Sequence, residues 1–348
     1  MTNRELAKKI GVSPATLSLV INNRPGISAE TRVRVLAKIK ELGLDSIVKT
    51  ETSPAAAAAD SSICFVVYKR HGNILDQSPF FLYIMESVAS CAHMHGYNLL
   101  FFSIDRRSPM EGQLARLAQT GCKGAVVFAT EMLEDDVPFL ADLPFPSVVL
   151  DNDFPLMNMD SVAINNTLGT FQAVEHLVSM GHKSIGYLKS HVFINSFDER
   201  TTGFGEAMRH FGLRFAQEHV FELDYSEEGS YQDFKKILVS RPHLPTAFVT
   251  DDDTIASGAI KALSEIGVSV PDDISIVGFN DRPLCEQSKP RLTTVRVPKY
   301  AFGAMAIDLL IKRINDNGVR SDSIRSIKYR VGTELMIRES VSRLDTAE

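Results

Sequence analysis

The chain has 348 residues, of which 44% are hydrophobic and 23% charged, and its formal net charge is −6. This length suits two or three domains with ample core material, and no apolar run reaches the length of a membrane span. The first residues lack the basic patch and apolar stretch of a secretory signal, and the four cysteines lie far apart without metal-ligand spacing. We therefore expect a soluble cytoplasmic protein with reduced thiols, no membrane contact, and no metal or cofactor.

Charge is divided unevenly along the chain. Residues 1–49 contain nine Lys/Arg and four Asp/Glu, a net charge of +5, so the remaining residues carry −11. A small basic segment on a large acidic body favours contact of a polyanion with the N-terminal segment alone. A solvated basic face is the alternative, and charge by itself does not separate the two.

Three short helices are predicted in the N-terminal segment. The first begins with a capping box at Thr2 and ends at Gly11. Ser13 caps the second helix, and Pro14 fits its first position, where no amide donor is needed. Ser28 caps the third. Apolar residues at helical spacing supply a shared core: Leu6, Ala7, Ile10, Leu17, Val20, Ile21, Val35, Ile39 and Leu42.

The second helix turns small and short polar residues outward. Ala15, Ser18, Leu19 and Asn22 lie opposite its apolar stripe. Two helices joined at a tight turn and braced by a third are typical of a helix-turn-helix unit, and a face without long charged side chains can approach base edges in the major groove of DNA. The alternative is a three-helix cap without a ligand. Layout and charge together favour the DNA-binding interpretation.

A linker is predicted over residues 49–62. Its sequence from Thr50 to Ser62, TETSPAAAAADSS, has one proline, five consecutive alanines and no large apolar residue. This composition favours an extended connection with a helical turn or two from Pro54 onward.

Strand and helix patterns alternate from Ile63 onward, which predicts repeated βαβ units and a mostly parallel sheet. The pattern divides near Asn165 into two doubly wound halves with a ligand cleft at the carboxyl ends of their strands. We expect an effector-binding and dimerisation domain over residues 63–342, with a first subdomain at 63–164 plus 297–323 and a second at 165–296 plus 324–342. The clearest strand candidates are 63–68, 99–104, 124–129, 146–151, 184–189, 246–251 and 275–281.

Several motifs match one known family in the right order along nearly the whole chain. They are VSPATLS (12–18) with Asn22, SAETR (28–32), SPFF (78–81), GHKSIGY (181–187), RTTGF (200–204), VPDDISIVGFND (270–281) and LTTVRVP (292–298). On these motifs the chain resembles the LacI/GalR family of bacterial transcription regulators.

The resemblance implies a helix-turn-helix head on a body similar to periplasmic binding proteins. It implies a repressor that binds a palindromic DNA operator as a homodimer, with a small-molecule effector in the cleft that changes DNA affinity. The residues expected to contact DNA are Thr2, Ser13, Pro14, Ala15, Thr16, Ser18, Leu19, Asn22, Thr31 and Arg32.

Two features of the head depart from the family pattern. Leu19 stands where the family commonly has an arginine that reads guanine, and leucine cannot donate to O6 or N7. The family's linker usually inserts a leucine into the minor groove, whereas no leucine occurs between Asp45 and Ser62. Either Ile47 or the alanines take over that insertion, or this chain bends DNA less.

Matching the family residue by residue points to seven cleft residues: Phe80, Phe81, Asp151, Arg200, Tyr225, Asp252 and Asn280. Arg200 offers a planar fork of donors, and the carboxylates and Asn280 accept hydrogen bonds from hydroxyls. Three aromatic side chains supply apolar ring faces. The set suits a sugar, with Arg200 as the main anchor between Asp151 and Asp252. Asp252 stands where the family usually has Asn, and Asn280 where it usually has Asp.

Other functions remain as alternatives. No nucleophile–base spacing, phosphate-binding glycine loop or zinc pattern is present, which argues against an enzyme. A solute-binding protein for transport would share the body but would not need a basic helix-turn-helix head. A third possibility is a regulator of the same type whose body answers to a protein partner.

Overall fold

The computed structural model describes residues 3–21, 27–41, 62–77, 80–240, 242–316 and 326–344. The chain divides into two compact units, Met1–Asp60 and Ser61–Glu348, and each is described here by itself. Thr2, Asn22 and residues 49–61 of the predicted linker lie outside the described residues.

The first unit contains three helices packed on one small core. The described residues among those predicted to face inward form it, with Leu17, Val35 and Ile39 fully buried. Leu42 lies outside the described residues. Gly11, with φ +80°, makes the turn between the first two helices in a conformation that side chains rarely adopt. The helices are α1 (Asn3–Ile10), α2 (Pro14–Ile21) and α3 (Ala29–Glu41).

Both serine caps predicted for this unit are present. The hydroxyl of Ser13 accepts a hydrogen bond from the Thr16 amide at 3.0 Å, and that of Ser28 accepts from the Thr31 amide at 3.2 Å. Each bond satisfies an amide that has no partner within its helix, which fixes where α2 and α3 begin.

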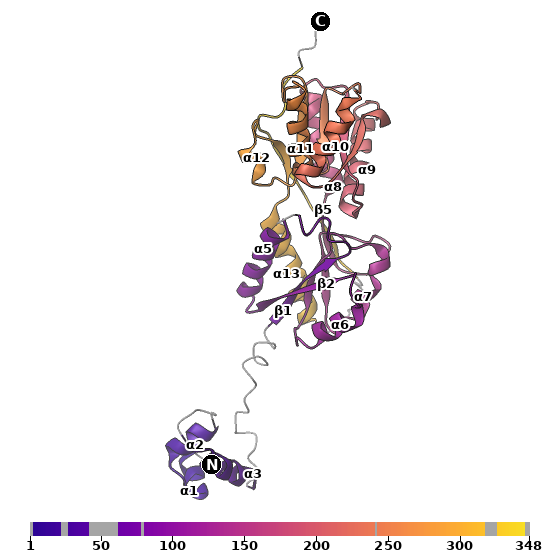
Figure 1. Cartoon of the computed structure of the whole chain (residues 1–348). Coiled ribbons are helices and arrows are strands. Elements are labelled where there is room, and N and C mark those ends of the chain that lie inside the picture. The colour runs from indigo at the N-terminus through magenta and orange to yellow at the C-terminus, as the bar shows by residue number, and fades with distance from the viewer. Residues whose placement is uncertain are drawn as a thin grey trace. The chain divides into compact units, whose positions relative to one another are not determined.

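The second unit begins with a six-stranded sheet in the order β11-β5-β4-β3-β1-β2, and all of its pairings are parallel. The strands are β1 (Ser62–Lys69), β2 (Asn98–Asp105), β3 (Ala125–Phe128), β4 (Ser147–Leu150), β5 (Ser161–Ile164) and β11 (Lys328–Val331). The accompanying helices are α5 (Phe80–Met94), α6 (Met110–Ala118), η2 (Glu134–Asp136), α7 (Pro138–Ala141) and α13 (Lys299–Asn315). Figure 1 shows α13, which comes from the C-terminal part of the chain, among these N-terminal elements.

A second six-stranded sheet has the order β12-β10-β9-β8-β6-β7, in which only β12 is antiparallel to its neighbour. Its strands are β6 (Ile185–Ser190), β7 (Val220–Leu223), β8 (Ala247–Thr250), β9 (Ser275–Phe279), β10 (Thr293–Arg296) and β12 (Glu334–Met336). The helices of this half are α8 (Asn166–Ser179), α9 (Asn195–His210), η3 (Gln217–His219), α10 (Glu227–Val239), α11 (Asp253–Glu265) and α12 (Leu284–Gln287). The predicted fold class is confirmed.

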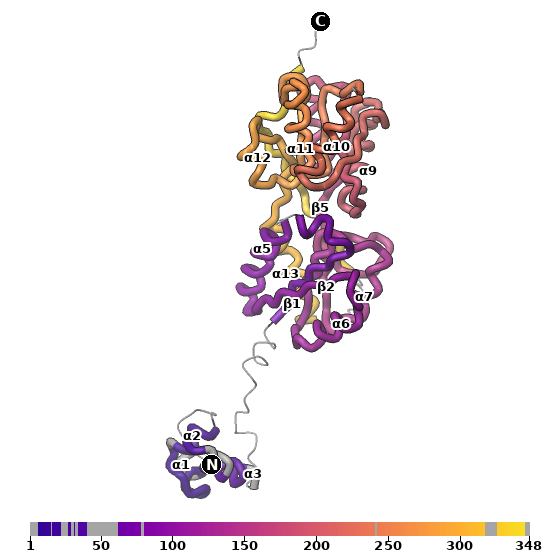
Figure 2. Tube along the Cα trace, viewed as in Figure 1, coloured from indigo at the N-terminus to yellow at the C-terminus, as the bar shows by residue number. Residues whose placement is uncertain are grey.

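The described chain passes between the two halves at three places, after β5, after β10 and after β11 (Figure 2). The last crossing differs from the sequence-based expectation, which placed residues 324–342 in the second subdomain. β11 instead pairs with β5 in the first sheet, with Lys328 opposite Ser161, because β5 would otherwise be an unpaired edge. Only the segment from about residue 332 enters the second half.

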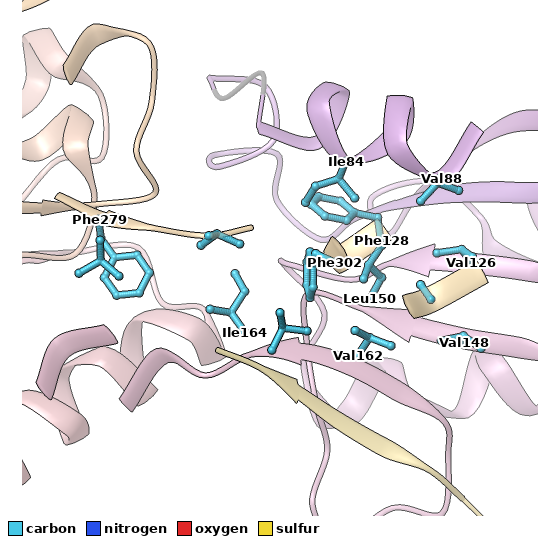
Figure 3. Packing of buried hydrophobic residues seen from close by; sticks show 14 of the residues in the cluster. Ile84, Val88, Val126, Phe128, Val148, Leu150, Val162, Ile164, Phe279 and Phe302 are labelled. Atoms are coloured by element: carbon cyan, nitrogen blue, oxygen red, sulfur yellow. The ribbon is translucent and has the colours of Figure 1, made fainter. Parts of the chain in front are cut away.

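One buried apolar cluster extends through both halves. In Figure 3, Phe128, Leu150 and Phe302 gather beneath α5, and Ile164 lies between them and Phe279 of the second half. The four cysteines are free and buried, as expected. In the described part of the chain, every helix is too short or too polar to span a bilayer.

Candidate functional site

A cavity lies between the two halves of the second unit, at the carboxyl ends of both sets of strands. It holds about 400 Å³ of space free of atoms, part of it open to solvent. All seven residues predicted for the cleft line it: Phe80, Phe81, Asp151, Arg200, Tyr225, Asp252 and Asn280. The sheet topology explains this convergence, because parallel strands end at one edge and present the residues that follow them to the same space.

The second half supplies a hydrogen-bonded group around Asp252, a fully buried carboxylate. One oxygen of Asp252 caps α11 by accepting from the Thr254 amide at 2.8 Å. The other oxygen accepts from the Asn280 amide at 2.6 Å and from Nη2 of Arg282 at 2.9 Å. Arg282 also donates to the Tyr225 hydroxyl. The carboxylate is therefore paired with a cation inside the wall of the cavity.

Arg200 lines the cavity as expected, but its contacts differ from those expected. Its Nε donates to Asn166 at 2.9 Å, and its Nη1 donates to the backbone carbonyl of Asp251. Neither contact joins it to the carboxylates of Asp151 and Asp252, so the expected bridge between them is wrong. The sequence analysis missed the true partner of Asp252, which is Arg282.

Asp151 faces the cavity from the first half, directly after β4. Its Oδ2 accepts from the Thr130 hydroxyl at 2.5 Å. Burial raises the pKa of Asp151 to about 6, although this hydrogen bond and the nearby charge of Arg200 oppose the rise. Asp151 is therefore mostly ionised at neutral pH but close to its titration range.

Three buried polar atoms around this cavity have no hydrogen-bond partner within the described part of the chain. They are Oδ1 of Asp151, Oδ1 of Asn280 and Nε of Arg282. Buried polar groups are rarely left unpaired, since each costs about 1–3 kcal/mol. Two acceptors and one donor around this space are therefore available to a ligand.

The remaining wall is largely apolar, and part of it depends on one carboxylate. Ile74 and Leu75 line the cavity from the loop after β1. The fully buried side chain of Glu131 holds that loop by accepting from its backbone amides, among them Gly72 at 2.8 Å and Ile74 at 3.0 Å. Five amides in all donate to Glu131, those of residues 70, 71, 72, 74 and 75.

The head presents a separate candidate site, the outer face of α2. Ser18 is exposed, and Thr16 and Leu19 are half-buried. Ala15 and Arg32 lie within helices, but their side chains are outside the description. The contacts of these residues with DNA therefore stay predictions.

Fold and sites together define a class of protein: a helix-turn-helix head and a two-part α/β body with a cavity between its halves. The profile described as "Bacterial regulatory proteins, lacI family" matches residues 2–44, and that described as "Periplasmic binding protein-like domain" matches residues 174–341. The "HTH-type transcriptional repressor PurR" of Histophilus somni (strain 129Pt) is 32% identical over 348 residues, 99% of both chains. The protein of the same name from Pasteurella multocida (strain Pm70) is also 32% identical, over 99% of both chains.

The chain belongs to the lacI family of bacterial regulatory proteins. It is a DNA-binding transcriptional repressor of that family rather than an enzyme or a solute-binding protein. Solved structures show the same fold. A lac repressor dimer bound to operator and an anti-inducer is 23% identical with a TM-score of 0.72, and a complex of the transcriptional regulator CelR with cellobiose is 24% identical with a TM-score of 0.70. Each covers 98% of this chain and 99% of its own.

Proposed function

We propose that this repressor binds its operator as a homodimer and is controlled by a sugar bound between the halves of its body. The observation that carries the effector part is a set of three polar atoms, around a cavity with aromatic walls, that have no partner among the described residues. Sugars present hydroxyls around the edge of a ring and C–H groups on its faces. The hydroxyls would satisfy the polar atoms, and the aromatic rings of Phe80 and Phe81 would cover a face.

Two similar structures support this chemistry. One contains cellobiose, and a lacI-family regulator from Enterococcus faecium contains ribose, with 24% identity, a TM-score of 0.66 and coverage of 82% of this chain and all of that one. Cellobiose and ribose are ligands of those two proteins. For this chain the argument rests on the residues around the cavity.

The position of the cavity suggests how a ligand would act. Asp151 belongs to the first half, whereas Asn280 and Arg282 belong to the second. A ligand that contacts all three favours the arrangement in which the halves are held together. If that arrangement and the open one differ in DNA affinity, the ligand shifts repression by its difference in affinity for the two.

The homodimer is proposed from an apolar surface on the first half. β2 is an edge strand, and its Phe101 is 55% exposed. Met94 at the end of α5 is 69% exposed, and Leu82 and Tyr83 on the same helix are also exposed. An edge strand with large apolar side chains is prone to uncontrolled pairing unless a partner covers it. A second copy of the chain is the occupant that a palindromic operator requires.

The test begins with calorimetry of the full-length protein against ribose, glucose, cellobiose and related free sugars. A sugar that binds should change operator retardation in a gel. The Asn280→Ala variant should lose about tenfold or more in affinity, because a buried hydrogen bond to a polar ligand is removed. Asn158→Ala, an exposed asparagine outside the cavity wall, is the control. Absence of binding across the panel would favour a protein partner as the effector.

A further inference from the structure

The charges around the cavity are balanced in an unusual way. The sequence exchanges Asp and Asn at positions 252 and 280 relative to the family pattern, and the structure shows what accompanies the exchange. Arg282 lies 2.9 Å from Asp252, and its side chain is only 10% exposed while that of Asp252 is fully buried. The carboxylate at position 252 is thus neutralised by Arg282, which lies in the loop that carries Asn280.

The two cations of the cavity wall are matched in number by two carboxylates. Arg282 is paired with Asp252, and Arg200 is engaged by Asn166 and by the Asp251 carbonyl. Against these two guanidinium groups stand the lining carboxylates of Asp151 and Asp252. A phosphate or carboxylate entering the cavity would add negative charge to a buried site that is already balanced.

The ion pair also fixes how Asn280 faces the ligand. The Asn280 amide nitrogen donates to Asp252, so its oxygen is left as an acceptor. Among the described residues the Nε of Arg282 is left as a donor, since its Nη2 bonds to the same oxygen of Asp252 as the Asn280 amide. Hydroxyl groups can both donate to the Asn280 oxygen and accept from Arg282, whereas an ionised phosphate oxygen can only accept.

We propose that the Asp252–Arg282 ion pair makes this cavity selective for uncharged, hydroxylated ligands over their phosphorylated or acidic counterparts. Arg282 and Asp252 are then the residues that determine specificity. The inference rests on the proposed control by a sugar and adds the charge class of that sugar.

The test compares free sugars with their phosphate esters by calorimetry: ribose with ribose 5-phosphate, and glucose with glucose 6-phosphate. The wild-type protein should bind a free sugar at least about tenfold more tightly than its ester. Asp252→Asn removes the carboxylate and leaves the Arg282 cation unpaired. This variant should lose affinity for the free sugar and gain affinity for the ester, moving the ratio by about tenfold or more.

A matched control is available in the first half. Asp160 is also buried and also paired with an arginine, Arg313, at 2.6 Å, but outside the cavity wall. Asp160→Asn should leave the ratio of affinities unchanged. An equal shift in both variants would assign the effect to net charge and overturn the proposal.

A second variant covers the case in which Asp252→Asn does not fold, which thermal melting would show. Arg282→Gln should lose about tenfold in free-sugar affinity without gaining affinity for the ester. Free-sugar binding equal to that of the wild type would overturn the role of Arg282. Tighter wild-type binding of the esters would overturn the charge selection alone, whereas no binding by any probe would overturn the proposed sugar control as well.

Discussion

The guanidinium carbon of Arg200 lies 3.7 Å from the centre of the Phe279 ring. Phe279 is the last residue of β9, and Arg200 also donates to the carbonyl of Asp251 just after β8. One side chain of α9 thus ties together the ends of two neighbouring strands. Because Asn280 directly follows β9 and Asp252 lies two residues after β8, Arg200 positions the residues that face the ligand.

Replacing Arg200 with Ala should therefore destabilise the body as well as weaken ligand binding. The change removes two buried hydrogen bonds from a charged donor and a cation–π contact, a loss of about 2–4 kcal/mol in the free energy of unfolding. Chemical denaturation of the wild type and the variant measures it. Arg209→Ala, on the exposed side of the same helix, should change stability by less than about 0.5 kcal/mol. Equal stabilities for wild type and Arg200→Ala would contradict the positioning role.

Glu131 should stabilise the cavity wall formed by Ile74 and Leu75, as Arg200 stabilises the wall of the second half. Glu131→Gln replaces an acceptor-only carboxylate by an amide that brings its own donors toward five backbone N–H groups. We expect a loss of about 2–4 kcal/mol in unfolding free energy, and faster hydrogen exchange in residues 70–75. Mass spectrometry of deuterium uptake checks the second point. Glu134→Gln, which changes an exposed carboxylate nearby, should leave uptake in that loop as it is.

The sequence predicted the parts of the fold that depend on local pattern. Apolar strand runs separated by amphipathic helices indicated the parallel sheets and a cleft at the carboxyl ends of their strands. The cleft residues themselves, such as Asp151 and Asn280, came from the resemblance to the family, matched residue by residue. The strand at Lys328–Val331 was assigned to the wrong half because only one of its four residues is buried, so its pattern carries little information. Its place is set by pairing with β5, 167 positions earlier in the chain.

The ion pair and the loop anchor were missed for a similar reason. Arg282 lies two residues beyond Asn280, a position that sequence reasoning could have included among the cleft residues, but its pairing with Asp252 spans 30 positions. Glu131 binds amides 56 to 61 positions earlier. Hydrogen bonds of this kind depend on which strand ends become neighbours in the sheet. Short-range sequence patterns do not predict which strands are neighbours.

The raised pKa of Asp151 gives the body a pH-dependent stability. The pKa rises from 3.8 to about 6, so the folded state binds the proton more tightly than the unfolded state. The stabilising contribution of the protonated carboxyl is complete below about pH 4 and is lost as the pH rises through 6. Asp151→Asn should therefore gain up to about 3 kcal/mol relative to wild type between pH 4 and pH 7. Denaturation curves across this range test it, with the exposed Asp142→Asn as control. A constant difference would contradict the shift.

The proposed dimer surface makes a prediction about assembly. Phe101→Asp places a charge on the edge strand β2, where a second copy would have to desolvate it, so the dimer should weaken by a hundredfold or more, or about 3 kcal/mol. Sedimentation of the wild type and the variant measures the dissociation constant. Phe193→Asp changes another exposed phenylalanine, in the second half of the body, and should leave the assembly state unchanged. Equal effects of both changes would show that the surface around Phe101 is not the interface.

Base readout is predicted for Leu19 in the second helix of the head. Leu19 is half-buried, whereas Leu17 on the same helix is fully buried in the core. Replacing Leu19 with Arg introduces a donor pair for guanine, so selection from random operators should show a changed preference at one position per half-site, worth about 1–3 kcal/mol. Arg32→Ala, if that residue contacts phosphate, should weaken binding to all sequences alike and reduce its salt dependence. Leu17→Ala should instead lower the stability of the head by about 2–5 kcal/mol, which thermal melting would show. An unchanged operator preference in Leu19→Arg would show that Leu19 does not contact the bases.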